Sequence, residues 1–185
     1  MSAERFVSHK VFMAWEYEQE EIYLNEMSKK GWQVTEGGCF HTVFEKIPGR
    51  QFCYRLDYNP KAMKDPEERE RYIETFAADG WEFINNTFNG WIYLRKERKE
   101  GMEEEDFEIY SDSSSLGELF ARFDRMLLAC CIMALAALCL EISLLISSSN
   151  LLILVFVLLL LGLLLWLLQG KSRLKKVRQG LLEKN

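Results

Sequence analysis

The chain has 185 residues, a formal net charge of −5 at pH 7 and an average composition close to that of a soluble globular protein. That average hides two unlike parts, because residues 1–115 carry 15 Lys or Arg against 24 Asp or Glu, whereas residues 116–185 carry 8 against 4. The acidic first part argues against direct binding of nucleic acid, since affinity for a phosphate backbone comes largely from Lys and Arg.

The cysteines and the start of the chain indicate a reducing compartment. The five cysteines include no CxxC pair and are odd in number, so they fit neither a disulfide framework nor a zinc site. Residues 1–9 hold no apolar core that would predict a cleaved signal segment. The cysteines are Cys39 and Cys53 in the first part and Cys130, Cys131 and Cys139 in an apolar run.

Residues 9–47 are predicted to form a strand, a helix and a hairpin of two further strands. The first strand is expected at Lys10–Trp15. Ile22 and Met27 then recur on a helical face, and Gly31 is placed to end that helix. The strands expected after the helix are Trp32–Thr35 and Thr42–Ile47, joined by a glycine-containing turn.

Residues 51–97 repeat this order. Gln51–Tyr58 alternates aromatic or apolar with polar side chains, which predicts a strand. Asp65 and Pro66 mark the start of a helix, with Asp as the cap and Pro in the first turn, and Gly80 is placed to end it. The strands expected next are Trp81–Ile84 and Trp91–Lys96.

The two segments align with each other at a constant offset of 49 residues. Gly31-Trp32 then falls over Gly80-Trp81, and Val43–Lys46 falls over Ile92–Arg95. A constant offset over about 25 positions predicts one unit used twice. The expected fold class is therefore α+β, with duplicated β-α-β-β units that form a mostly antiparallel sheet and two helices on one face of it. A parallel arrangement would need crossover connections that the short links do not supply.

The last third of the chain is predicted to form a transmembrane hairpin. Residues 101–115 are an acidic, Ser-rich linker, and residues 116–125 an amphipathic helix that lies along the membrane or docks on the first domain. Apolar runs at 126–148 and 151–169 follow, each long enough to cross a hydrocarbon core of about 30 Å. Ser147–Asn150 suits a tight turn between them. The alternative is a soluble helical hairpin, but such helices normally show a polar face, which the second run lacks.

The flanking charges predict the orientation of this hairpin. Arg122 and Arg125 precede the first run, the turn carries no basic residue, and a basic tail at 170–185 follows the second run. We therefore expect a multi-pass protein of the cell membrane with both termini cytoplasmic and with the tail against anionic lipid headgroups. The basic residues of the tail are Lys171, Arg173, Lys175, Lys176 and Arg178.

Two features of the apolar runs suggest more than anchoring. Glu141 is an ionisable side chain inside the first run, which raises the hypothesis of transport or coupling. It lies six residues before the turn, however, where a carboxylate reaches headgroups or water. The Cys130-Cys131 pair is a candidate for acylation, or an ordinary pair of membrane-core residues.

The sequence contains no recognisable catalytic constellation. Nucleophilic catalysis usually needs a base close to a Ser or Cys, and the only histidines are His9 and His41, at a predicted strand start and in a predicted hairpin. A Gly-rich phosphate loop and a metal-ligand cluster are also missing from the sequence. We therefore expect no enzyme activity, no catalytic residue, no cofactor and no metal.

Aromatic side chains offer a candidate partner groove. The alternative is that they fill the core between sheet and helices, since aromatic residues dominate small cores. Arg55 and Asp57 share one face of a predicted strand and are expected to pair with each other or with the facing strand. The candidate groove residues are Trp91, Trp32, Trp81 and Tyr54.

The spacing of aromatic and Gly-Trp positions over residues 9–97 resembles the bacterial family known as domain of unknown function 2812. That resemblance implies C-terminal hydrophobic segments, genes beside PadR-like transcriptional regulators, and a role in envelope or stress signalling. It supplies no catalytic or binding residue. The positions that carry it are Trp15, Glu21–Leu24, Asn25-Glu26-Met27, Gly31-Trp32, Phe44-Glu45, Tyr54-Arg55-Leu56-Asp57 and Gly80-Trp81.

These features lead to two functional hypotheses. The first is a membrane-tethered regulatory module whose cytoplasmic domain, residues 1–100, recognises a protein partner. The second is a subunit of a membrane transporter or channel-like oligomer, suggested by Glu141 and by small residues on the first run that permit close helix packing.

Overall fold

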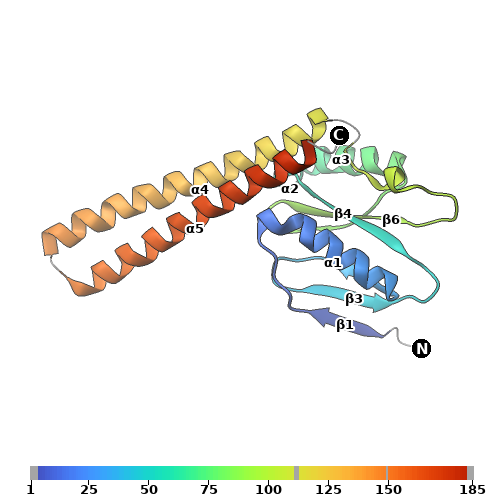
Figure 1. The fold of residues 1–185 in the computed structure, drawn as a ribbon, viewed down its shortest axis with the longest axis horizontal. Helices are drawn as coiled ribbons and strands as arrows, with labels where there is room; N and C mark the ends of the chain where they lie inside the picture. The colour runs from blue at the N-terminus through green and yellow to red at the C-terminus, as the bar shows by residue number, and fades with distance from the viewer. Residues whose placement is uncertain (1–3, 111–112, 149, 183–185) are drawn as a thin grey trace. The chain divides into compact units, whose positions relative to one another are not determined.

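The computed structural model describes residues 4–110, 113–148 and 150–182 (Figure 1). The chain divides into two compact units, Met1–Asp112 and Ser113–Asn185. Residues 1–3 at the start, 111–112 of the predicted linker, Ser149 of the predicted turn and 183–185 of the predicted tail lie outside the described residues.

The first unit is an α+β fold with two antiparallel three-stranded sheets, as the sequence predicts for the class. One sheet has the strand order β1-β3-β2 and the other β4-β6-β5. The strands are β1 (Arg5–Ser8), β2 (Trp32–Glu36), β3 (Thr42–Lys46), β4 (Phe52–Tyr58), β5 (Glu82–Asn86) and β6 (Trp91–Glu97). The helices are α1 (Tyr17–Lys29), α2 (Lys61–Lys64) and α3 (Pro66–Ala78), with short 3-10 turns at Ala14–Glu16 and Glu104–Phe107.

Both halves of this unit place their elements in the same order. In each sheet the last strand along the chain lies between the other two, so the topologies match. The pairing register slips between Val34 and Glu36 in the first sheet and between Phe83 and Asn85 in the second. These irregularities are 49 residues apart, the offset that the sequence itself shows.

The helix boundaries follow the predicted signals. Gly31 and Gly80 both have φ near +80°, a left-handed conformation that glycine adopts without a steric penalty, and each ends its helix. The Asp65 carboxylate accepts the Glu67 and Glu68 N–H groups at 3.0 and 3.3 Å, with Pro66 in the first turn of α3.

The predicted strand at Lys10–Trp15 is wrong. The strand lies earlier, at Arg5–Ser8, where Phe6 and Val7 pair with Phe44 and Val43 of β3. Trp15 instead enters a 3-10 turn and is buried. The self-alignment already held the correct signal, because an offset of 49 places β4 over residues 3–9.

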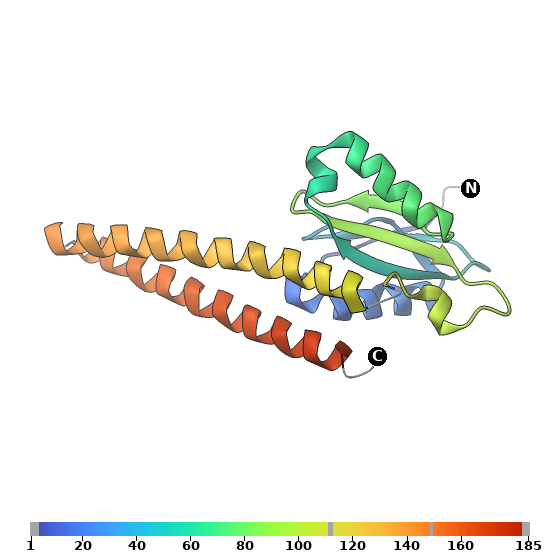
Figure 2. The ribbon, with the colours of Figure 1, turned by 90° about the horizontal axis from the view of Figure 1, so that it is seen from above.

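The two long helices of this unit lie against opposite faces of the sheet β4-β6-β5, not on one face. Tyr72 and Phe76 of α3 pack on a core cluster that includes Trp81, Ile92 and Leu94 (Figure 2). On the other face, β6 and β4 present residues that contact α1, and the Tyr17 ring stacks on Trp91 at 5.7 Å. The antiparallel strands form two sheets that both contact α1, whereas one sheet was expected.

α1 also closes the open edge of β4. The backbone N–H groups of Phe52, Tyr54 and Leu56 point away from β6, and each donates to a side chain of α1. The three α1 acceptors are spaced by four and three residues, which advance a helix by about 6 and 4.5 Å. The three β4 donors are two residues apart, and two strand residues advance nearly 7 Å, so helix and strand stay roughly in step. The acceptors are Ser28 Oγ at 2.8 Å, Asn25 Oδ1 at 2.8 Å and Glu21 Oε1 at 2.7 Å.

The segment predicted as a linker packs onto this unit. Phe107 is fully buried in the core cluster, and Ile109 contacts it. The Tyr110 hydroxyl donates to Asp57. The run Glu103–Asp106 keeps its side chains exposed, as expected for a solvated acidic stretch. The first unit therefore extends beyond the predicted boundary at residue 100.

The second unit is a pair of long helices, α4 (Ser113–Ser148) and α5 (Leu151–Leu182). The amphipathic segment predicted at 116–125 is continuous with the first apolar run, and the basic tail continues α5 as helix. Between the helices Cys131 and Ala134 of α4 pack with Leu164 of α5. Two spans, Gly117–Ser148 and Leu151–Gln179, are long and apolar enough to cross a membrane. Only 11% of the most apolar 18-residue stretch of each span is buried.

Candidate functional site

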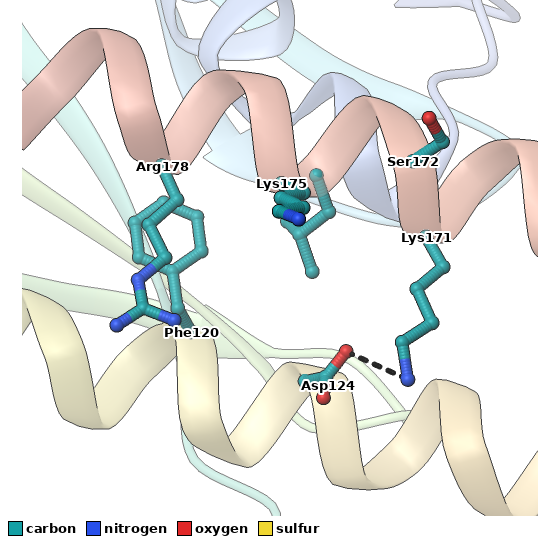
Figure 3. Close-up of a pocket in the computed structure, with 7 residues that line it drawn as sticks. Phe120, Asp124, Lys171, Ser172, Lys175 and Arg178 are labelled. Carbon is teal, nitrogen blue, oxygen red and sulfur yellow. Dashed lines mark ion pairs between the residues drawn. The ribbon is translucent and has the colours of Figure 1, made fainter.

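A pocket of 380 Å³ lies between α4 and α5 at the end of the hairpin opposite its turn (Figure 3). Phe120 and Asp124, four residues apart on α4, form one wall. The facing wall comes from α5, where residues three or four apart share one face of the helix. The α5 residues that line it are Lys171, Ser172, Leu174, Lys175 and Arg178.

The pocket divides the predicted basic tail into two groups. Lys171, Lys175 and Arg178 line it, whereas Arg173 and Lys176 are not among the lining residues. The helical period explains the division, because residues 173 and 176 fall between the positions that recur on the pocket face. A tail that the sequence presents as one basic stretch is thus two faces of one helix.

The charges of the pocket are unequally compensated. Lys171 Nζ lies 3.2 Å from Asp124 Oδ1, and Figure 3 shows this pair bridging the two helices. No ion pair is found for Lys175 or Arg178 within the described part of the chain. Three cations against one carboxylate give the pocket a formal charge of +2, while the buried Phe120 and Leu174 supply an apolar wall. This combination suits an anion that carries an apolar portion.

The four aromatic candidates of the predicted groove belong to separate packing environments. Tyr54, Trp81 and Trp91 are buried, and Tyr54 has no exposed surface at all. The Tyr54 hydroxyl accepts the Val34 N–H at 2.9 Å, on the open edge of β2. Trp32 is half-buried, beside Phe6, with Lys46 Nζ 4.8 Å from its ring centroid. These placements favour the alternative that the aromatic side chains fill the core.

A different apolar feature, which the sequence analysis did not identify, lies at the tips of two hairpin turns. Phe40 follows β2 and is 66% exposed; Phe88 follows β5 and is 75% exposed. They are the most exposed large hydrophobic side chains among residues 4–110. Cys39 Sγ lies 3.4 Å from Asn89 Oδ1, so the two turns are neighbours. We call Phe40 and Phe88, with the turns that carry them, the phenylalanine tips.

Hydrogen bonds and close packing hold the phenylalanine tips in place. The Asn85 side chain spans the two hairpins, since its Oδ1 accepts the Gly37 N–H and its Nδ2 donates to the Gly37 carbonyl, both at 2.8 Å. A Cβ atom at Gly37 would meet the Tyr93 ring at 2.3 Å, so only glycine allows this approach. The useful sequence signal was a Phe in each of two equivalent turns, although Phe40 and Phe88 are 48 residues apart and so differ by one position from the offset of 49.

Two carboxyl groups of α1 are perturbed by burial. Burial raises the pKa of Glu20 to about 7, although the Tyr93 hydroxyl donates to it at 2.6 Å. Burial also raises the pKa of Glu21 to about 8, with Arg55 3.8 Å away acting in the opposite direction. Glu21 accepts the Leu56 N–H at the edge of β4 and lies beside Arg55 of the same strand, so we interpret both contacts as structural.

Arg55 and Asp57 both have partners outside β4 and the strand that faces it. Arg55 contacts Glu21 and Glu108, the latter at 3.2 Å, and Asp57 accepts the Tyr72 and Tyr110 hydroxyls. These partners come from α1, α3 and the segment after β6. Their contribution was not visible in the strand pattern, which shows only neighbours along β4.

The remaining candidates lie apart from one another. Glu141 is half-buried on α4, seven residues before the last residue of that helix. Cys131 is buried between the two long helices, while its neighbour Cys130 is half-buried. Among the residues that the structure describes, no group of three or more His, Cys, Asp or Glu side chains could hold a metal ion.

The fold and the two long helices define an α+β protein with a C-terminal apolar hairpin. Residues 16–132, more than half of the chain, match the family described as "Protein of unknown function (DUF2812)". The chain belongs to this family. The match runs from the residue before α1 into the apolar part of α4, so it includes both units in part. No curated protein and no solved structure matches the chain.

Proposed function

We propose that this protein is a membrane-tethered binding module, in which α4 and α5 cross the cell membrane and the α+β unit recognises a protein partner in the cytoplasm. The observation that carries the binding proposal is the pair of phenylalanine tips, which present two exposed aromatic rings on a positioned scaffold. Buried aromatic anchors are the residues that contribute most to many protein interfaces.

The composition of the two long helices supports the membrane part of the proposal. Both helices leave most side chains of their most apolar stretches exposed, since only 11% of each stretch is buried. In water, such a surface would be an apolar patch much larger than soluble monomers normally expose. The excess of Lys and Arg at the open end of the hairpin supports cytoplasmic termini.

The geometry of the phenylalanine tips supports partner binding over chance exposure. Single exposed apolar residues are common, but two at neighbouring turns form a patch. Both turns are tied together through Asn85 and Gly37, so a partner would lose little conformational freedom on binding. The matched topology of the two halves is consistent with a duplicated unit, which would place equivalent turns side by side.

Family resemblance suggests the setting of this function. Genes beside PadR-like transcriptional regulators would place the module in envelope or stress signalling, with a regulatory protein as its partner. Crosslinking from the phenylalanine tips identifies this partner by direct contact.

Site-specific photocrosslinking in native membranes tests the binding proposal. A photoreactive phenylalanine analogue at position 40 or 88 of the full chain should give one reproducible crosslinked protein. The same analogue at Ile22, which is 59% exposed on α1, is a matched control and should not. Equal crosslinking from all three positions, or none from positions 40 and 88, would contradict the proposal.

Extraction and labelling test the membrane proposal. The full chain should stay with the membrane after carbonate treatment, and a cysteine introduced at Ser147 should react with an impermeant reagent added outside cells. A cysteine introduced at Ser172 should react only after the cells are opened. Release by carbonate, or the opposite labelling pattern, would refute the anchor or its orientation.

A further inference from the structure

We infer that the pocket between α4 and α5 binds the phosphomonoester headgroup of an anionic lipid, one molecule per chain. This inference rests on the proposed membrane location and adds a defined ligand site to it. It differs from a general attraction between a basic tail and the membrane, because it assigns the interaction to one face of α5.

The charge of the pocket matches a phosphomonoester. Asp124 pairs with Lys171, which leaves Lys175 and Arg178 as the two lining cations without an ion pair among the described residues. These two side chains are three residues apart on α5, so they can reach one anion together. A phosphomonoester carries a charge of about −1.5 to −2 at pH 7, whereas a phosphodiester carries one negative charge.

The shape and lining of the pocket match an amphiphile more closely than a free anion. Its 380 Å³ is near the small end of ligand pockets, about the size needed for a headgroup and its first carbons. The Ser172 hydroxyl adds a hydrogen-bond donor. Phe120 and Leu174 line the pocket beside the cations, so this part of its wall is apolar.

The position of the pocket along the hairpin matches the depth of lipid headgroups. The uncharged run of α5 ends at Gln169, and the lining residues begin at Lys171. From Lys171 to Arg178 the helix advances about 10 Å. Each polar region of a bilayer is about 5–8 Å thick beyond the hydrocarbon core. The three cations thus fall in and just beyond the layer that contains lipid phosphates.

Lipid titration of the full chain in dodecyl maltoside micelles, read by native mass spectrometry, tests this inference. Phosphatidic acid should bind as one retained molecule and at least about tenfold more tightly than phosphatidylglycerol or phosphatidylcholine of the same acyl chains. Inorganic phosphate should compete only weakly. No preference for phosphatidic acid would overturn the inference, and equal affinity for inorganic phosphate would show a site for soluble anions.

Two double variants separate the pocket from diffuse electrostatics. K175Q/R178Q removes two charges from the pocket face, and R173Q/K176Q removes two charges, also three residues apart, from other faces of the same helix. The first should weaken phosphatidic acid binding at least about tenfold and the second less than about twofold. Equal losses would overturn the pocket in favour of general attraction.

Further controls keep folding and membrane location separate from binding. Circular dichroism should show equal helicity in both double variants, and K175R, which keeps the charge, should retain binding. Failure of the carbonate test would refute the membrane anchor. The micelle experiment compares lipid binding by the two double variants, and its result does not depend on the anchor or its orientation. If K175R binds as weakly as K175Q/R178Q, the charge argument is refuted.

Discussion

Replacing Asn25 by leucine should expose how strongly α1 supports the sheet edge. The Asn25 side chain accepts the Tyr54 N–H at 2.8 Å and donates to the Tyr54 carbonyl at 3.2 Å. Tyr54 has no exposed surface, so water cannot easily take over either bond. Leucine has a similar size but offers no polar atom, so both backbone groups of Tyr54 would be left without this partner.

The expected loss follows mainly from one unsatisfied buried group, the Tyr54 N–H, because the Tyr54 carbonyl keeps the bond that Arg55 Nη1 donates at 3.3 Å. An unpaired buried backbone group costs about 1–3 kcal/mol. Glu26→Leu is the matched control, because Glu26 is the next residue of α1 and is exposed. It should change the free energy of unfolding by less than about 0.5 kcal/mol.

Urea unfolding of the full chain in detergent measures this difference through tryptophan fluorescence. Four of the five tryptophans lie in the first unit, so the signal reports mainly on it. Hydrogen exchange should show faster exchange of the Tyr54 amide in Asn25→Leu. A loss below about 0.5 kcal/mol, with the Tyr54 amide still protected, would refute the edge-closing role of α1.

The remaining predictions concern α1, a turn and the apolar hairpin. Burial raises the pKa of Glu21 from 4.5 to about 8, so between these pH values the folded chain keeps a proton that the unfolded chain releases. The free energy of unfolding should therefore fall as pH rises from 5 to 9. Urea titrations at each pH should show that Glu21→Gln removes up to about 5 kcal/mol of that fall. An unchanged slope would show that Glu21 is ionised when folded. Gly37→Ala should destabilise the first unit by about 1–3 kcal/mol, since its Cβ would overlap the Tyr93 ring, and an unchanged urea midpoint would contradict this packing. Glu141→Gln should leave the mass of the complex in mild detergent unchanged, because Glu141 lies near the end of α4; a changed mass would favour the transporter-subunit alternative.

The two candidate sites have different physical origins. The phenylalanine tips depend on side-chain bonds between two hairpins, such as those of Asn85 with Gly37. The pocket depends on helical periodicity, which brings Lys171, Lys175 and Arg178 to one face of α5. A partner and a lipid would therefore be recognised by separate units of the chain, and the variants proposed for one leave the other unaltered.

Local signals in the sequence determined the elements of this protein. Asp65-Pro66 and the Gly-Trp pairs fixed where helices end and strands begin, because capping and left-handed turns are decided by neighbouring residues. The apolar runs predicted two long helices, because about 20 apolar residues leave no polar face. The alternating pattern of Gln51–Tyr58 predicted β4 almost to the residue.

Tertiary structure alone decided how similar segments came to differ. At the offset of 49, Glu21, Asn25 and Ser28 of α1 correspond to Glu70, Glu74 and Ala77 of α3, which are exposed. Only the first set lies beside an open strand edge, that of β4. The β4 residues are distant from α1 in sequence, so a local sequence pattern does not reveal these hydrogen bonds. The same reason applies to the placement of Phe107 in the core, to the pairing of Asp57 with Tyr72 and Tyr110, and to the pocket that divides the basic tail. A sequence pattern identifies a helix face or a strand face, but the fold determines what that face meets.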